Sequence, residues 1–301
     1  MHTTRNPPEH PHGWNWNQRR SVRPGRRLHQ ATDATAPSRL RIGRDLRHAV
    51  EHDEFVLHYQ PEIDASTGHM VAAEALIRWQ HPQLGMIRPN TFIPVAEDQG
   101  LIGKIGQWVL ETACAQLHAW HAAGHDLRVA VNFSVEQLRR RDIADTVANA
   151  LERFDLQPDD LVVEITESIC MRANDRAREN VARLAHLGIR LAIDDFGTGY
   201  SSLSYLKRMP VRILKIDRSF VVDLADGPDS TIVRNIISLA HELDLIVIVE
   251  GVETPAQHEL LRVMGCDMVQ GYLVGESLPP ALFHDAFLAP RQHTIVEPER
   301  I

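Results

Sequence analysis

The chain has 301 residues, 44% of them hydrophobic and 24% charged, which is the composition of an ordinary soluble globular protein with one large domain or two small ones. Its formal net charge of −8 argues against bulk electrostatic binding to DNA or RNA, but not against a small anion held by local cations or a metal. No apolar run approaches the roughly 20 residues that a membrane span needs, and the N-terminus lacks the apolar core of a signal peptide. The three cysteines are far apart, which fits a reducing cytosol, so we expect a cytoplasmic protein.

Three segments of the chain differ in composition. Residues 1–38 combine five prolines with an arginine cluster and few aliphatic residues, so we expect a disordered or loosely attached basic tail. A solvated leader is the favoured interpretation, and contact with RNA, an acidic lipid surface or the acidic body of the same protein is the alternative. Residues 39–290 hold the periodic apolar segments of one folded domain, and residues 291–301 form a C-terminal tail.

Strands and helices alternate through most of the folded domain. The predicted helices cover residues 40–50, 91–97, 103–122, 143–154, 175–187, 203–208, 231–243 and 255–264. The predicted strands cover residues 55–60, 71–77, 127–132, 161–165, 190–193, 212–215, 245–249 and 268–270. Most of these strands are continuously apolar, as in a parallel sheet covered on both faces, so the alternation predicts an α/β protein with a (β/α)₈ TIM-like barrel. A short connection at Gly68 joins the first two strands and would allow an antiparallel pair. A doubly wound open sheet is the alternative, but the chain lacks a glycine-rich dinucleotide fingerprint.

Polar side chains lie at or near the C-terminal ends of successive predicted strands. They are Glu74, Asn132, Glu164, Asp194, Asp195, Lys215, Asp217, Glu250, Glu253 and Gln270. In a barrel these strand ends ring a single mouth, which is where active sites lie. One acid after a strand means little, but successive strands that each deliver such a group to one rim predict a functional site.

The segment of residues 191–203, LAIDDFGTGYSSL, concentrates this pattern. An apolar run ends at Asp194 and Asp195, and Gly197 and Gly199 then permit backbone shapes that other residues resist. Two adjacent like charges are costly unless a cation neutralises them, and oxygen-rich sites suit Mg²⁺ or Mn²⁺. A solvated turn is the alternative for an isolated pair, but the repeated acids on other strands favour a metal site.

The polar set offers enough oxygen atoms for two cations. The donors toward one cation would be Glu74, Asn132, Glu164 and Asp194, and the donors toward a second would be Asp195 with Glu250 or a neighbour. Two cations about 3.5–4 Å apart can activate a water and stabilise charge on a phosphoryl group. Lys215 suits water orientation, proton transfer or simple neutralisation of the acids, and Arg78 suits either a phosphate or a salt bridge on the rim.

These residues lie in motifs that resemble the EAL-domain family of cyclic di-GMP phosphodiesterases. The motifs are EALIRW at 74–79, VNFS at 131–134, EITES at 164–168, DDFGTGYS at 194–201, LKID at 214–217, EGVE at 250–253 and QGY at 270–272. The resemblance covers about residues 40–290, and the motifs in this order are highly specific. The basic tail has no counterpart in it.

The resemblance implies a barrel that hydrolyses cyclic di-GMP to linear pGpG with two Mg²⁺ or Mn²⁺ ions. It implies ligands for the first metal at Glu74, Asn132, Glu164 and Asp194, and for the second at Asp195. Lys215 and Glu250 would place and activate the water, and Glu167 would hold the loop of Asp194 and Asp195 in its working shape. The implied substrate contacts are Gln60, Arg78, Asp217, Glu253 and Gln270. The loop at 196–202 is similar to one tied to contact within a homodimer.

A few residues depart from the family pattern. Val274 and Glu276 stand where the family more often has an aromatic and a basic residue, and Glu62 stands where an aliphatic residue is commoner. None of these changes removes an implied metal ligand, so an active phosphodiesterase is the favoured function. A non-catalytic cyclic di-GMP receptor that acts through a protein partner is the alternative, and an unidentified regulatory partner is compatible with both.

Overall fold

The computed structural model describes residues 39–167, 175–198, 206, 209–224 and 229–289. Both predicted tails, at 1–38 and 291–301, lie outside the described residues. So do the predicted helix at 203–208, except for Leu206, and the part of the predicted dimer loop after Thr198. Among the described residues, no helix combines the length and the apolar character that crossing a membrane requires.

The described strands form one sheet that closes on itself. They are β1 (Phe55–Asp64), β2 (Met70–His81), β3 (Gly85–Ile87), β4 (Arg128–Asn132), β5 (Leu161–Thr166), β6 (Arg190–Phe196), β7 (Ile213–Ile216), β8 (Ile246–Val249) and β9 (Met268–Gln270). The neighbour order is β1-β9-β8-β7-β6-β5-β4-β2-β3, and β1 also pairs with β2, so eight of these described strands make a barrel. Strand β1 is antiparallel to both of its neighbours, whereas β2 and β4 to β9 run parallel. The predicted barrel with an antiparallel first pair is therefore confirmed.

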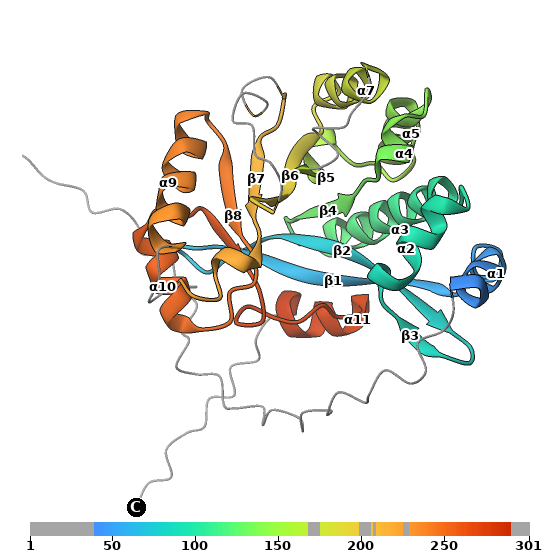
Figure 1. The fold of residues 1–301 in the computed structure, drawn as a ribbon, viewed down its shortest axis with the longest axis horizontal. Coiled ribbons are helices and arrows are strands. Elements are labelled where there is room, and N and C mark those ends of the chain that lie inside the picture. Colours follow the sequence, from blue (N-terminus) through green and yellow to red (C-terminus); the bar gives the residue numbers. More distant parts are fainter. Residues whose placement is uncertain (1–38, 168–174, 199–205, 207–208, 225–228, 290–301) are drawn as a thin grey trace, which may run out of the picture.

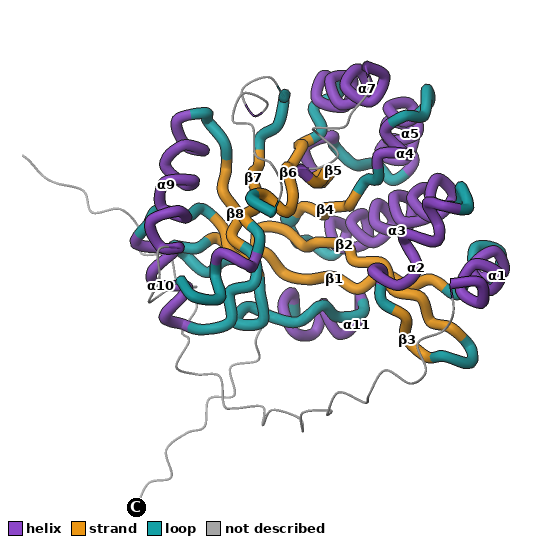
Figure 2. Tube along the Cα trace, in the orientation of Figure 1, coloured by secondary structure: helices purple, strands orange, loops and turns teal. Residues whose placement is uncertain are grey.

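Helices cover the outside of the barrel (Figures 1 and 2). They are α1 (Arg39–Ala49), α2 (Pro89–Asp98), α3 (Ile102–Ala122), α4 (Val135–Leu138), α5 (Ile143–Arg153), α7 (Asp175–His186), α9 (Asp229–Glu242), α10 (Pro255–Val263) and α11 (Pro280–Phe283). The 3₁₀ turns η2 (Pro158–Asp160) and η3 (Arg218–Phe220) and the π-helical turn η4 (His284–Leu288) complete the set. The outward-facing strand residues and the buried helix faces share one large apolar core, to which α3 contributes Leu110, Leu117 and Trp120.

The inside of the barrel is built in two layers. Side chains alternate along a strand, so residues two apart point to the same side. The lower layer, which we call the apolar plug, consists of Ala72, Ala130, Val162, Ala192, Ile213, Ile248 and Met268. Two residues further along the same seven strands lies the polar layer, which consists of Glu74, Asn132, Glu164, Asp194, Lys215, Glu250 and Gln270. The plug closes the barrel floor, and the polar layer faces the mouth.

Three local features differ from the predicted elements. Strands β1 and β2 extend past the predicted ends into a longer hairpin, and β3 pairs with the end of β2 where the sequence indicated only a polar turn. Strand β6 does not stop at Ile193 but continues to Phe196. The β6–β7 register shifts between Ile193 and Phe196, and Asp195 has a φ of 54°. This bulge lets the strand continue through the two acids, which local sequence pattern did not indicate.

Candidate active site

Lys215 lies at the centre of the polar layer. Its side chain is fully buried, and its Nζ is 2.7 Å from Glu164 Oε1 and 2.7 Å from Glu250 Oε1. Glu62 Oε1 at 3.5 Å and Glu74 Oε2 at 3.6 Å complete a shell of four carboxylates. The attraction between opposite charges holds the ammonium among these acids. The cluster therefore gathers more negative than positive charge.

Burial and crowding shift the pKa values of these acids. Burial, followed by the charges of Glu74 and Asp194, raises the pKa of Glu164 well above its usual range, although Lys215 opposes the shift. Burial likewise raises the pKa of Glu250 to about 8, again against Lys215. The same surroundings raise the pKa of Lys215, because the carboxylates outweigh the effect of its burial. In the absence of another cation, part of the cluster thus holds protons near neutral pH.

Glu74 differs from the other acids because its pKa is lowered, and amide groups donate hydrogen bonds to its carboxylate. Burial would raise its pKa, but Lys215 and the hydrogen bonds from Gln270 and Asn132 lower it. Asn132 Nδ2 donates to Glu74 Oε1 over 2.8 Å, and Gln270 Nε2 donates to Glu74 Oε2 over 2.7 Å. These donors hold Glu74 ionised in the middle of the barrel. With its Nδ2 turned to Glu74, Asn132 keeps an amide oxygen in the same layer.

The two adjacent acids are fixed by their own backbone. The backbone N–H of Asp195 donates to Asp194 Oδ1 over 2.9 Å, and the positive φ of Asp195 turns its side chain away from the ordinary strand direction. Burial and the neighbouring Asp194 raise the pKa of Asp195 to about 6. Glu167 Oε2 accepts a hydrogen bond of 3.1 Å from the N–H of Gly197. Glu167 is thus in contact with the loop that follows the two acids.

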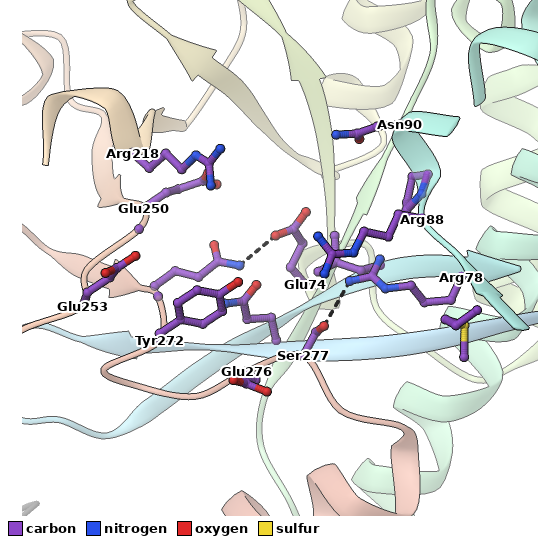
Figure 3. A pocket seen from close by; sticks show the side chains of 17 residues that line it. Glu74, Arg78, Arg88, Asn90, Arg218, Glu250, Glu253, Tyr272, Glu276 and Ser277 are labelled. Carbon is purple, nitrogen blue, oxygen red and sulfur yellow. Dashed lines mark hydrogen bonds between the residues drawn. The ribbon is translucent and has the colours of Figure 1, made fainter. Parts of the chain in front are cut away.

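A cavity of about 810 Å³ opens above the polar layer (Figure 3). Of the predicted site residues, Gln60, Glu74, Arg78, Glu250, Glu253 and Gln270 line it. Arg78 donates one bond of 3.0 Å to Ser277 Oγ, and Gln60 Nε2 donates to the Gly275 carbonyl over 3.2 Å. Figure 3 shows Arg78 and Arg88 on one side of Glu74, with Glu250 and Glu253 on the other. The cavity thus combines carboxylates with the guanidinium groups of Arg78, Arg88 and Arg218.

The remaining predicted residues lie beside or beneath this cavity. Asn132, Asp194 and Asp195 line a second cavity of about 830 Å³ that shares Leu76, Pro89 and Asn90 with the first. Glu164 and Lys215 are almost completely buried in the polar layer, beneath both cavities. The Asp217 side chain does not line the first cavity. It accepts a bond of 2.9 Å from the N–H of Ser219 and caps η3, and its neighbour Arg218 lines the cavity instead.

Several cavity residues were not among the predicted site residues. Arg88, Asn90, Tyr272 and Ser277 come from loops and helix starts, where no periodic pattern distinguishes a lining residue from a solvated one. Tyr272 is 66% exposed at the rim. Glu62 is only 2% exposed and lies 3.5 Å from Lys215, and the sequence marked it only as a charged residue where the family more often has an aliphatic one. Glu62 comes close to Lys215 because β1 closes the barrel between β2 and β9, and the local sequence pattern does not indicate that contact.

The described residues do not present three acidic, histidine or cysteine side chains in an arrangement ready to hold a metal. The Lys215 ammonium stands among the acids instead. Even so, the donor set fits a hard divalent cation, because it is made of carboxylate and amide oxygens. Glu164 Oε1 is 2.7 Å from the Lys215 ammonium, whereas Glu164 Oε2 is buried without a hydrogen-bond partner among the described residues, and such an oxygen is what a bound cation would satisfy.

Comparison with known proteins identifies the family of this chain. A sequence model of the EAL domain matches residues 43–277, which is most of the folded part of the chain. The chain belongs to the EAL-domain family. The resemblance drawn from the sequence motifs is therefore confirmed, and the match begins inside α1 and ends at the cavity residue Ser277.

Related EAL proteins include two from Pseudomonas aeruginosa. A protein named bifunctional diguanylate cyclase/cyclic di-GMP phosphodiesterase MucR is 47% identical over 249 residues, which cover 82% of this chain and 36% of MucR. Cyclic di-GMP phosphodiesterase NbdA is 44% identical over 258 residues, which cover 85% of this chain and 33% of NbdA. The chain thus spans about a third of the length of these relatives.

Solved EAL structures show the same fold. The structure titled PaMucR phosphodiesterase, c-di-GMP complex, superimposes with a TM-score of 0.77 at 47% identity and covers 80% of this chain and 99% of that one. The EAL domain of FimX from Pseudomonas aeruginosa bound to c-di-GMP has a TM-score of 0.73 at 28% identity, over 79% of this chain and 96% of that one. Both titles describe complexes of those proteins with c-di-GMP.

Proposed function

We propose that this EAL domain hydrolyses cyclic di-GMP to linear pGpG in a reaction that depends on Mg²⁺ or Mn²⁺. The observation that carries the proposal is the polar layer, in which Glu74 of β2, Glu164 of β5 and Glu250 after β8 surround Lys215 beneath an open cavity. The names of MucR and NbdA support the choice of substrate. Hydrolysis adds one water and breaks one phosphodiester bond of the cyclic dinucleotide.

Two divalent cations would use the oxygen donors of the polar layer. We assign Glu74, Asn132, Glu164 and Asp194 to the first and Asp195 to the second. When bound, such cations supply Lewis acidity and lower the pKa of a bound water. The raised pKa of Asp195 and the Glu164 Oε2 atom, which is buried without a hydrogen-bond partner among the described residues, support this assignment, because a cation would supply the positive charge that these atoms lack.

The remaining polar residues would place the water and the substrate. Lys215 would donate to the attacking water or to the phosphate oxygens, and Glu250, whose pKa burial raises to about 8, would accept a proton on its carboxylate. Glu167 would hold the loop after Asp195 through its bond to Gly197. Substrate contacts are assigned to Gln60, Arg78, Asp217, Glu253 and Gln270, and the Arg78 guanidinium is suited to a phosphate.

Assembly and location complete the proposal. We infer that the protein forms a homodimer and lies in the cytoplasm. We also infer that a regulatory partner, not yet identified, can bind it. Cys114 and Cys266 are free and buried, which agrees with a reducing compartment. Light scattering of the purified protein at several concentrations tests the dimer, because a mass that stays at one chain throughout would contradict it.

Product analysis tests the reaction. The purified chain is incubated with cyclic di-GMP and Mn²⁺ or Mg²⁺, and the products are separated by chromatography. Linear pGpG from the wild type, but neither from Asp194→Ala nor in the presence of a chelator, is the expected result. If no product forms while cyclic di-GMP binds, the domain is a receptor and the proposed activity is wrong.

A further inference from the structure

Glu62 is a buried carboxylate that the proposed reaction does not use. It lies on β1, is 2% exposed, and does not line the substrate cavity. Its Oε1 is 3.5 Å from Lys215 Nζ and has no hydrogen-bond partner among the described residues. Burying a carboxylate costs more than burying an apolar side chain of similar size, so its presence calls for a specific interaction.

The strand register sets the level at which Glu62 meets Lys215. Because β1 is antiparallel to its neighbours, Glu62 pairs with Gln270 of the polar layer on one side and with Ala72 of the apolar plug on the other. Glu62 therefore lies at the boundary between the two layers. Glu164 and Glu250, by contrast, belong wholly to the polar layer, two residues beyond the plug residues Val162 and Ile248.

The Lys215 ammonium is thus drawn in two directions. Glu164 and Glu250 attract it from within the polar layer at 2.7 Å each, and Glu62 attracts it toward the plug at 3.5 Å. An ammonium that sits fully on Glu164 and Glu250 competes with a divalent cation for the same oxygens. The Coulomb attraction of a nearby buried carboxylate is strong enough to shift that competition.

We propose that Glu62 is a positioning residue that offers the Lys215 ammonium a carboxylate at the floor of the polar layer, so that the ammonium withdraws from Glu164 and Glu250 when a divalent cation binds those oxygens. The inference rests on the proposed function, but its main test measures Mn²⁺ binding without substrate. When a neutral residue replaces Glu62, the Lys215 ammonium stays bound to Glu164 and Glu250 and competes with the divalent cation for their oxygens. Mn²⁺ affinity and kcat then fall, whereas KM for the dinucleotide, which does not touch Glu62, stays the same.

The test compares Glu62→Gln and Glu62→Met with wild type by Mn²⁺ titration calorimetry, thermal melting of the metal-free protein, and steady-state kinetics. Both variants are expected to melt at or above the wild-type temperature, because one acid leaves a crowded anionic cluster. Their Mn²⁺ affinity is expected to fall by about 10-fold or more, which is the usual effect of losing a group that orients metal ligands. Ile63→Val, on the same strand but in the outer core, is the matched control and should keep wild-type Mn²⁺ affinity.

A double-mutant cycle separates positioning from a general effect of charge. In a Lys215→Met background, Glu62→Gln is expected to change Mn²⁺ affinity by less than about twofold, because Glu62 acts through the ammonium. An equal loss in both backgrounds would overturn the inference, as would unchanged Mn²⁺ affinity in the single variants. Wild-type Mn²⁺ binding without turnover of cyclic di-GMP would refute only the proposed reaction, and the Glu62 comparison would still be decisive.

Discussion

The two layers inside this barrel are built by the same seven strands and behave in opposite ways. In the apolar plug, Ala130, Val162 and Ile213 pack together without a polar atom in their side chains. Two residues further along these strands, Asn132 donates a hydrogen bond to Glu74, and Glu164 and Lys215 form a buried ion pair. One step of two residues, about 7 Å of strand, separates a layer that stabilises the fold from one that does not.

The contrast shows how the barrel supports a costly site. Buried charges crowd around Lys215, and burial raises the pKa values of Glu164, Glu250 and Asp195. Burying such charges seldom stabilises a fold and often opposes it. The plug and the outer helical core must therefore supply the stability, which leaves the polar layer free to serve binding and chemistry. Substitutions in the two layers should accordingly separate activity from stability.

The largest expected effect is on activity, from the polar layer. Glu74→Ala should lower kcat by on the order of a thousandfold, as removal of one charge-stabilising group in an active site does. The variant should still show a cooperative melt, because the change removes a buried charge rather than core packing. Turnover assays and thermal melting together check this. Wild-type turnover in Glu74→Ala would contradict the assignment of Glu74 as a metal ligand.

Removal of the central cation should strongly affect stability. Lys215→Met leaves Glu62, Glu74, Glu164 and Glu250 without their shared counter-charge, and breaking a buried ion pair in this way costs about 3–5 kcal/mol. Added Mn²⁺ should restore much of the loss, because it replaces the missing positive charge. Denaturant unfolding with and without Mn²⁺ measures both effects. A variant as stable as wild type without metal would show that Lys215 does not neutralise the cluster.

The plug should show the opposite pattern. Ile213→Ala removes a buried side chain that is 4% exposed and should lower the free energy of unfolding by about 2–5 kcal/mol. Its kcat per folded molecule should stay within about threefold of wild type, since an interaction absent from the transition state leaves the barrier unchanged. Chemical denaturation and kinetics well below the melting temperature provide the measurement. A loss of kcat as large as that of Glu74→Ala would contradict the prediction that the plug serves stability and the polar layer serves activity.

A change of pH perturbs the metal-free protein without altering a residue. The folded pKa values of Glu62, about 7, and Glu250, about 8, are raised above the ordinary value of 4.5, so the folded state holds these protons more tightly than the unfolded state. Stability is then full below about pH 4.5 and falls as the pH rises toward 8, by at most about 1.4 kcal/mol per pH unit for each group. Melting at pH 5, 6.5 and 8 tests this. Glu250→Gln should flatten the upper part of the curve, whereas stability that rises over this range would contradict the pKa shifts.

The sequence predicted most of the fold and much of the polar layer. The polar strand ends at Glu164, Lys215 and Gln270 were visible because a run of apolar residues is interrupted by one charged or amide group. Residues whose role depends on distant strands were not predictable. Glu62 meets Lys215 only because β1 closes the barrel between β2 and β9, and Arg88 reaches the cavity only through the hairpin that β3 extends.

Mn²⁺ binding to the metal-free protein, followed by the loss of the free-ion paramagnetic resonance signal, tests most directly whether the polar layer is a divalent-cation site. We predict two bound Mn²⁺ per chain for the wild type and at most one for Asp194→Ala, with both proteins showing the same folded circular dichroism spectrum. Failure of the wild type to bind Mn²⁺, or equal binding by Asp194→Ala, would contradict the assignment of this layer as the metal site.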